Sequence, residues 1–335
     1  MDPAIDSLDA QAAALEARFG ERLQRPAPRA IRARRHGATD RAQRIVRSDL
    51  EQHHAAELRA GKLTLDGLAE PIEVRSAAVS LTGSSMSISK IAGRIAETPF
   101  SASFEKKGTQ PAKFSLELDE ADAEEIQRIL TPTLAREGPG FLARTLRLRG
   151  APPVPAWLKA RKAEGTISIA SATAGEWKGR EVKARVQWDG TAVHFTNISA
   201  QLDSGATTGT MDVDLTTPVA KFHLEGSING VAYHGGSLDL TGTVDAEGIG
   251  DALLSSAHAE GTVRGRNIAF AQDADFRTFS AAFTMQPLGT APRWKLANVE
   301  ANALQGSGAT LEDGRLQLDL GANHYTGTLF GPKTR

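Results

Sequence analysis

The feature that most constrains this chain is an alternation of apolar and polar residues that runs through many short segments, with glycine-bearing turns between them. From Pro152 to Leu215 the alternation is clear, as in Ile167 and Ile169. An alternation of period two places the apolar side chains on one face of a β-strand. The stretch therefore predicts antiparallel strands with a single apolar face.

The phase of the alternation changes within this stretch. Val193 and Phe195 share one face, whereas Ile198 and the apolar residues that follow it fall in the opposite phase. A shift by one residue turns the following side chains to the other face of a sheet unless an extra residue is accommodated. We therefore predict a turn or bulge at Thr196-Asn197.

The same pattern extends over most of the chain. From Lys62 to Leu118 it predicts roughly six short strands, whose short connections favour pairing between sequence neighbours. After Leu215 further alternating segments continue to Leu329, and the clearest run holds Phe279, Ala281, Phe283 and Met285. We expect a mostly β protein whose strands form a long, curved antiparallel meander.

Helical spacing is confined to a few segments. The spacing of apolar residues in 1–60 predicts two helices joined by an Arg- and Pro-rich connection. Asp122 and Glu125 resemble a capping box that opens a short helix, and the segment Asp251-Ala-Leu-Leu reads as a second short insert. Residues 141–149 fit either a helix or a strand.

These elements suggest three regions. We expect an N-terminal helical segment over 1–60, a first β meander over 61–150 with a helix near 122–135, and a second β region over 151–332. Such a chain of 335 residues is long enough to bury a sizeable core.

Composition excludes several functional classes. The net charge of -1 gives no overall attraction to nucleic acid or anionic lipid. The lack of cysteine excludes disulfides, thiolate metal sites and cysteine nucleophiles. We find neither an apolar run of membrane-spanning length nor a secretory signal near Met1. We therefore expect either a soluble chain or one whose membrane anchor lies elsewhere.

Local motifs point to no reaction centre. The Arg-rich stretch from Arg22 to Arg47 lacks interleaved aromatic residues, so we interpret it as a solvated connection rather than a nucleic-acid or lipid contact. The histidines, including His194, His223 and His258, lie on separate segments and lack metal-ligand spacing. The glycine-rich pieces match no phosphate loop, and no Gly-x-Ser-x-Gly elbow is present. We expect no catalytic residues, no metal and no cofactor.

The predicted strands outnumber the predicted helices, so the apolar face needs another cover. Leaving a Leu or Phe exposed costs about 1.5–3 kcal/mol relative to burying it. Right-handed twist curls an open sheet of more than ~10 strands into a trough. A closed trough would be a filled core, and an open one would be an apolar channel that suits acyl chains. The pattern alone leaves both possibilities open.

Four motifs of the central stretch carry a resemblance to a known family. They are Pro155-x-Trp157-Leu158, Gly165-Thr-Ile167-x-Ile169, the turn Trp188-Asp-Gly190, and Gly205-x-x-x-Gly209-x-Met211-x-Val213-x-Leu215. In this succession the chain resembles the C-terminal region of the AsmA-like family, bacterial envelope proteins related to TamB. The resemblance covers about residues 61 to 330 and is weaker in its first third.

This resemblance implies a non-enzymatic envelope protein with a long, curved β-sheet and an apolar groove that conducts phospholipid between the inner and outer membranes, in support of outer-membrane assembly. It implies a periplasmic location with a tether to the inner membrane, and as partners phospholipid, both membranes and other envelope proteins, but no nucleic acid. The residues that we expect to contact acyl chains are the inward-facing ones of the central strands: Ile167, Ile169, Val182, Val186, Trp188, Val193, Phe195, Met211, Val213, Leu215, Phe222, Leu224, Leu238 and Leu240.

Two other functions fit the pattern of residues. A β-rich module could bind protein partners of the envelope through exposed sheet edges. A carbohydrate-active enzyme would need a pair of carboxylates in one cleft, which the sequence does not indicate.

Overall fold

The computed structural model describes residues 54–136, 153–175, 177–202, 205–233, 235–271, 274–288, 291–303, 315–320 and 323–330. Of the two compact units into which the chain divides, one is Ala55–Ser80 with Ser85–Arg335, and it holds the sheet described below except for His54, Leu81 and Thr82. The other unit contributes only His54 and Leu81–Ser84 to the described residues. Most of the helical segment expected over 1–60 lies outside the described residues.

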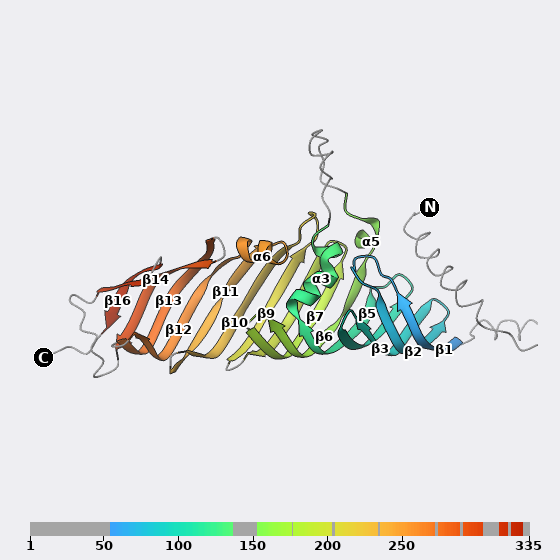
Figure 1. Cartoon of the computed structure of the whole chain (residues 1–335), viewed down its shortest axis with the longest axis horizontal. Coiled ribbons are helices and arrows are strands. Elements are labelled where there is room, and N and C mark those ends of the chain that lie inside the picture. The colour runs from blue at the N-terminus through green and yellow to red at the C-terminus, as the bar shows by residue number, and fades with distance from the viewer. Residues whose placement is uncertain are drawn as a thin grey trace, which may run out of the picture. The chain divides into compact units, whose positions relative to one another are not determined.

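The described strands form a single curved, unclosed sheet of 16 strands (Figure 1). Sequence neighbours are also spatial neighbours, except that β16 lies between β14 and β15. The predicted curved, mostly antiparallel meander is therefore confirmed. The strands are β1 (His54–Leu63), β2 (Ile72–Thr82), β3 (Ser85–Ile95), β4 (Thr98–Lys107), β5 (Ala112–Asp122), β6 (Lys162–Ala174), β7 (Trp177–Asp189), β8 (Ala192–Leu202), β9 (Gly205–Asp214), β10 (Lys221–Tyr233), β11 (Gly236–Glu247), β12 (His258–Ala271), β13 (Ala274–Leu288), β14 (Ala291–Ala303), β15 (Arg315–Leu320) and β16 (Asn323–Phe330).

Three short helices accompany the sheet in the described part of the chain: α3 (Ala123–Leu134), α5 (Ala156–Lys159) and α6 (Asp251–Ser256). The helices expected near 122–135 and at 251 are thus present. The first two lie in the crossover between β5 and β6, which pair in parallel and therefore need a long connection.

One secondary-structure prediction is wrong. The N-terminal helical segment was expected over 1–60, but strand β1 already begins at His54 and runs to Leu63. The sequence around Ala55 and Leu58 has good helix formers, yet pairing with β2 outweighs that weak local preference. Ala60, with a φ of 55°, interrupts the regular strand backbone.

The predicted irregularity at Thr196-Asn197 is confirmed. The register between β8 and β9 shifts between Phe195 and Ile198, and Asn197 has a φ of 52°. Equivalent shifts occur in β3 next to Lys90 and in β10 next to Gly230, both of which have positive φ. An extra residue of this kind bends a strand and increases its twist. The bulges therefore contribute to the curvature of the sheet.

A row of glycines crosses four neighbouring strands. Gly209 of β9 pairs with Gly226 of β10, Gly226 pairs with Gly242 of β11, and Gly242 pairs with Gly261 of β12. At each of these positions a Cβ atom would collide with a backbone oxygen of the adjacent strand. Only glycine fits such a close approach, and glycine kinks allow strands to bend sharply. We call these four residues the glycine row, along which the backbones of β9 to β12 approach closely.

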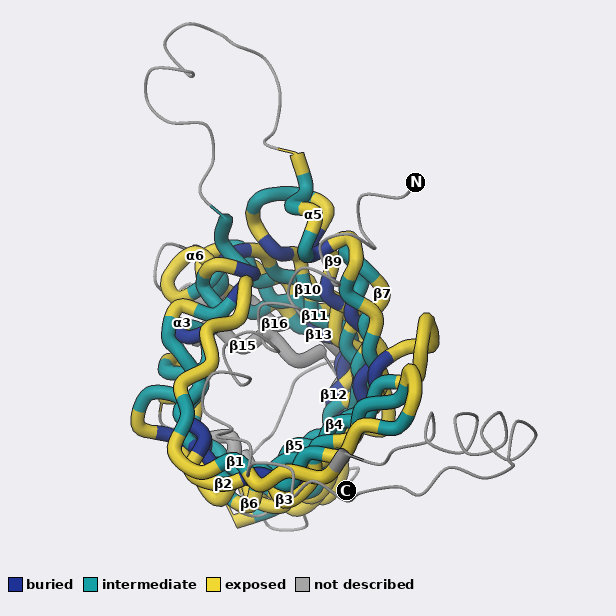
Figure 2. Tube along the Cα trace, turned by 90° about the vertical axis from the view of Figure 1, so that its right-hand side faces the viewer, coloured by how far each residue is buried: buried dark blue, intermediate teal, exposed yellow. Residues whose placement is uncertain are grey.

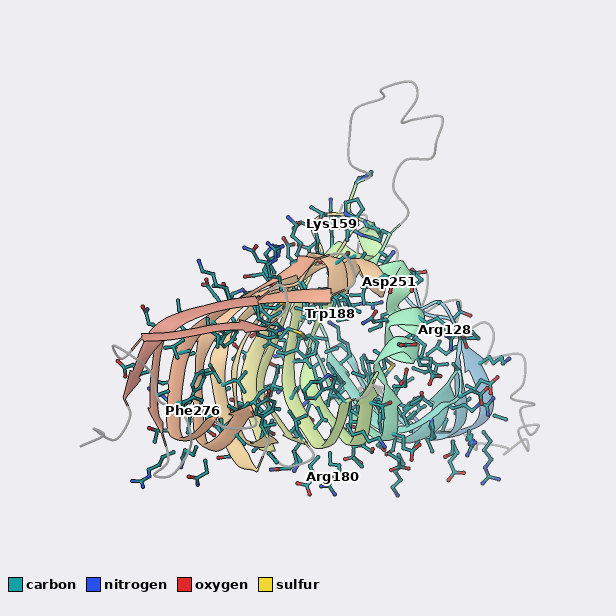
Figure 3. All side chains as sticks on the ribbon, turned by 60° about the vertical axis from the view of Figure 1, so that its left-hand side comes forward. Arg128, Lys159, Arg180, Trp188, Asp251 and Phe276 are labelled. Atoms are coloured by element: carbon teal, nitrogen blue, oxygen red, sulfur yellow. The ribbon has the colours of Figure 1, made fainter. Side chains whose placement is uncertain are left out.

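The two faces of the sheet differ in polarity. The inner face carries Phe195, Met211 and Leu224 on successive strands, and the outer face carries their polar sequence neighbours, such as His194 and Asp212. Figure 3 shows Arg180 projecting from the outside of the curved sheet. The alternation read from the sequence is therefore an alternation between a polar convex face and an apolar concave one.

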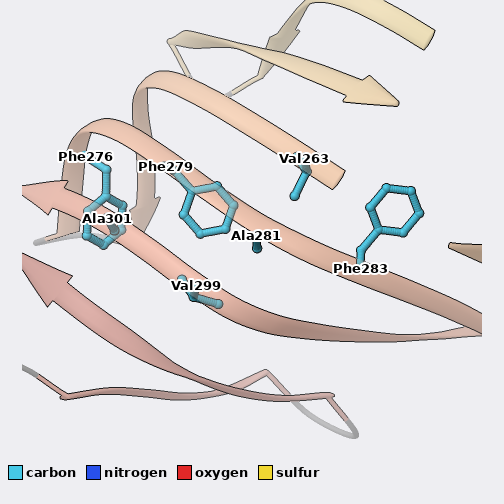
Figure 4. Close-up of a cluster of buried hydrophobic side chains, with 7 residues drawn as sticks. All are labelled: Val263, Phe276, Phe279, Ala281, Phe283, Val299 and Ala301. Atoms are coloured by element: carbon cyan, nitrogen blue, oxygen red, sulfur yellow. The ribbon is translucent and has the colours of Figure 1, made fainter. Parts of the chain in front are cut away.

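Two clusters of buried side chains lie on the inner face. The first, on β12 to β14, consists of Val263, Phe276, Phe279, Ala281, Phe283, Val299 and Ala301 (Figure 4). The second joins Leu158 of α5 to residues of β7, β8 and β9 and to the connection after β9. Figure 2 shows that buried positions are confined to short stretches of the trace, while most of it is intermediate or exposed. The inner face is thus covered in parts only.

Candidate functional site: the inner face of the sheet

Strand register brings most of the predicted contact residues onto one face. One row runs from Val186 through Phe195, Met211 and Leu224 to Val244, each paired directly with the next on the neighbouring strand. A second row, nearer the strand ends, contains Trp188, Val193, Val213 and Phe222. Directly opposed residues of antiparallel strands point to the same side. The residues predicted to share the inward face on β7 to β10 do so.

Four of the predicted contact residues belong to the protein's own core. Val186, Val193, Val213 and Leu215 have exposed fractions of 3%, 6%, 6% and 1%. They pack around Leu158 of α5, which is completely buried. The alternation in these strands does not indicate that this short helix covers their end of the sheet. A ligand cannot reach these four side chains, so we assign them to the core instead of the contact surface.

Trp188 is also held by the protein itself. The Arg161 guanidinium lies 5.0 Å from the ring centroid of Trp188 and 5.0 Å from that of Trp157. The indole N–H of Trp188 donates to the carbonyl oxygen of Gly190 at 2.8 Å. Burial between the two rings lowers the pKa of Arg161 from its ordinary value. These contacts fix α5 on the sheet and take Trp188 out of the contact surface as well.

The remaining predicted residues are partly exposed on the inner face. Ile167 and Phe222 border the α5 cluster, and Leu238 and Leu240 border the β12–β14 cluster. Ile169 pairs with Val182 on β6 and β7, and both are half-buried. These residues line the inner face but do not complete a closed core.

One part of the inner face that neither cluster covers lies on β10 and β11. Leu224, Ile228 and Val244 belong to neither buried cluster, and Leu224 is 36% exposed. Together with Met211 they form what we call the central inner patch, which the glycine row crosses between Leu224 and Ile228. Ile228 and Val244 were not among the predicted contact residues. The alternation of Ile228 and Val244 with polar neighbours indicates that both face inward. The bulge that follows Ile228 in β10 obscures this alternation in the sequence.

Helix α3 joins the two rims of the sheet. At its start, the Asp122 carboxylate accepts from the backbone N–H groups of Glu124 and Glu125, each at 3.0 Å, and from the Thr173 hydroxyl at 2.8 Å. These donors, Glu125 first, hold the pKa of Asp122 below its ordinary value. Asp122 is thus the helix cap that the sequence predicted.

The other end of α3 is tied to the opposite rim. The backbone N–H of Ala220 donates to the carbonyl oxygen of Leu134 at 2.7 Å, and Ala135 forms a β-bridge with Val219 in the β9–β10 connection. Strands β6 and β9 run in opposite directions, so Thr173 near the end of β6 and Val219 just after β9 lie on opposite rims. Helix α3 is therefore a strap across the open side of the sheet.

The outer face carries a row of alternating His and Asp side chains that the sequence did not predict. His194, Asp212, His223, Asp245 and His258 occupy one row across β8 to β12. The Nδ1 atoms of His194 and His223 lie 2.6 and 2.7 Å from Asp212 and Asp245. The hydrogen bond to Asp245 raises the pKa of His223. The histidines are scattered in sequence but aligned in space, although the described residues contain no group of three or more side chains able to hold a metal.

A small pocket lies where the crossover meets the β1–β2 loop. Its volume is about 200 Å³, below the usual 300–1,000 Å³ of small-molecule sites. The lining residues are Asp66, Gly67, Pro132, Arg136, Pro153, Pro155 and Trp157. We therefore regard the inner face, rather than this pocket, as the candidate functional site.

Comparisons with protein-family models, with curated proteins and with solved structures gave no match. Among the described residues, no helix is long and apolar enough to cross a bilayer.

Proposed function

We propose that this protein binds phospholipid by laying acyl chains against the inner face of its sheet. In this proposal the protein is non-enzymatic, periplasmic and tethered to the inner membrane, and it conducts lipid toward the outer membrane in support of outer-membrane assembly. The sequence resemblance to the AsmA-like family motivates the cellular part of the proposal. The observation that carries the binding part is the partial exposure of the central inner patch.

The patch supports acyl-chain binding through its exposure and its chemistry. Leu224, Ile228 and Val244 are apolar and lie on the concave side, yet neither buried cluster includes them. Leaving such side chains in water is unfavourable by about 25 cal/mol per Å² of apolar surface. An acyl chain would remove that surface from water without needing a directional partner.

The arrangement of the patch also suits movement of a bound chain. The inner-face rows run across successive strands, and apolar contact is non-directional, so a chain can slide from one strand to the next without breaking hydrogen bonds. At the glycine row no side chain projects between Leu224 and Ile228. A lipid that moved along the row of strands would pass beneath the strap formed by α3.

The test replaces one patch residue by a charge and places the same charge on the outer face as a control. In Leu224→Asp a carboxylate enters the central inner patch. In Thr241→Asp it enters the exposed outer face of β11, between Ser227 and Thr262. Both proteins are purified from bacterial cells and analysed by native mass spectrometry with lipid extraction, and far-UV circular dichroism verifies folding.

We expect Leu224→Asp to lose most of the lipid that the parent carries, and Thr241→Asp to keep it. A folded Leu224→Asp protein with as much lipid as the parent would remove the basis of the proposal. Substitutions of Val186 or Val213 are unsuitable for this test, because both side chains are in the core and a charge there would report on folding.

A further inference from the structure

The outer face of β7 carries an unusual concentration of positive charge. Lys178, Arg180, Lys183 and Arg185 are all exposed, and none of them forms an ion pair with another described residue. Several other basic residues of the sheet, among them Lys62, Lys113 and Lys162, do pair with a carboxylate. We call these four residues of β7 the β7 basic stripe.

The strands on both sides of the stripe leave this charge uncompensated. The residues paired with Arg180, Lys183 and Arg185 are uncharged: Ser171, Ser168 and Thr166 on β6, and Gln201, Ser199 and Thr196 on β8. Glu164 of β6 is already paired with Lys113. The carboxylates in line with Arg180 and Lys183 across the sheet are Glu120 and Glu117 of β5. They are two strands away from β7, about 10 Å.

One carboxylate lies within the stripe. Glu181 is exposed on β7 and has a φ of 52°, at a point where the β7–β8 register shifts. Residues 178–185 of β7 therefore carry four cationic side chains and one anionic side chain. The stripe therefore keeps an excess of positive charge on a chain whose net charge is -1.

The stripe ends at an exposed tryptophan. Trp177 opens β7 at the tip of the β6–β7 hairpin and is 66% exposed. An indole ring with an apolar body and a polar N–H favours the boundary between lipid and water. Basic residues combined with an exposed Trp are the features by which a protein surface engages an anionic bilayer.

We propose that the β7 basic stripe and Trp177 form a docking surface for an anionic phospholipid bilayer. The lysine and arginine side chains would contact the headgroup phosphates, and Trp177 would enter the interfacial layer. Trp177 alternates with Lys178 along β7 and lies beside the stripe at the rim, at the tip of the β6–β7 hairpin. The stripe is on the outside of the sheet, so it is separate from the acyl-chain contacts proposed for the inner face. The two proposals are therefore independent, and the failure of one would not contradict the other.

The experiment measures sedimentation of the full chain with vesicles of pure phosphatidylcholine and with vesicles that contain phosphatidylglycerol. The test variant is Arg180→Gln with Lys183→Gln. The matched control is Arg264→Gln with Lys295→Gln, which removes the same charge from exposed positions on β12 and β14. A third variant, Trp177→Ala, removes the aromatic anchor without changing charge. Lipid loading of every variant is measured alongside.

We expect the parent to bind only the phosphatidylglycerol vesicles, and less strongly as salt rises. Each basic side chain near an anionic leaflet tightens binding about fivefold, so the stripe variant should bind about 25-fold more weakly. The control variant should bind like the parent, and Trp177→Ala should bind several-fold more weakly at all salt concentrations. All variants should keep their lipid loading.

Three results would overturn the proposal. One is an equal loss of binding in the stripe and control variants, which would mean that only total charge matters. Another is a parent that does not distinguish the two kinds of vesicle. The third is binding of soluble polyglutamate as tightly as the anionic vesicles, which would point to an acidic protein partner instead of a membrane.

Discussion

The glycine row allows a quantitative prediction about the close approach of β9 and β10. In Gly226→Ala the new Cβ would lie 2.6 Å from the backbone oxygen of Thr208 and 3.4 Å from the Cα of Gly209. Cβ atoms essentially never come within 3.0 Å of a heavy atom outside their own and the adjoining residues. The obstructing atom belongs to the backbone of β9, so no flexible side chain can move aside. Strand β9 or β10 must therefore shift.

The expected cost follows from the chemistry of overpacking. Forcing one extra methyl group into a closely packed position costs about 1–3 kcal/mol. The matched control is Gly179→Ala on β7, where the nearest atoms to a new Cβ are Val182 Cγ2 at 3.7 Å and Leu202 Cδ2 at 3.8 Å. This is ordinary contact, so the control should be neutral or stabilised by about 0.4–1 kcal/mol through reduced entropy of the unfolded chain.

The assay is urea unfolding of both variants and the parent, followed by far-UV circular dichroism. Gly226→Ala should lower the unfolding midpoint and Gly179→Ala should not, with a difference in unfolding free energy of about 2 kcal/mol between the two. If Gly226→Ala unfolds at the same urea concentration as Gly179→Ala, the close approach of β9 and β10 is not required and the reasoning about the glycine row is wrong.

Three further predictions concern α5, the outer histidines and the strap. Leu158→Ala should lower the unfolding free energy by about 2–5 kcal/mol, measured by urea unfolding, because the side chain is fully buried; an effect no larger than that of an exposed Leu254→Ala would contradict the assigned core. In an NMR titration His223 should lose its proton at a pH above the ordinary 6.5, and Asp245→Asn should bring its pKa down. Because the pKa of His223 is higher in the folded state than in the unfolded state, the His223–Asp245 pair stabilises the fold at pH values below the unfolded pKa. This contribution is lost as the pH rises through the folded pKa. An unchanged pKa of His223 in Asp245→Asn would refute the pairing. Ala135→Cys with Val219→Cys should form a disulfide in this cysteine-free chain and stabilise it by about 2–4 kcal/mol until reductant is added, since the two residues face each other across a β-bridge; failure to oxidise would show that the strap is not held at this rim.

The sequence predicted the strands well because their signal is local. The alternation in β8 revealed even the bulge at Asn197, since the change of phase between Phe195 and Ile198 requires an extra residue in the strand. The cap of α3 was equally visible, because Asp122 and Glu125 are only three residues apart. Local periodicity also predicted which residues of β7 to β10 share a face.

What the sequence did not predict depends on contacts between distant residues. Leu158 covers Val186 and Val213, but nothing in the local pattern of β7 or β9 indicates which part of an apolar face a helix will occupy. The row of His194, His223 and His258 depends on the register of five strands, which spacing along the chain does not specify. Strand β1 was mistaken for a helix because its pairing with β2 is a tertiary effect.

The order of the strands has a consequence for how such a protein can vary in size. Since nearly every strand pairs only with the ones before and after it in sequence, the sheet resembles a repeat array whose units contact their immediate neighbours. A hairpin such as β12 with β13 could be duplicated or deleted without altering the pairing of the strands near β1. The number of hairpins would then set the length of the sheet across its strands. Helix α3 is an exception to pairing between neighbours, because it connects the β5–β6 crossover to the β9–β10 connection.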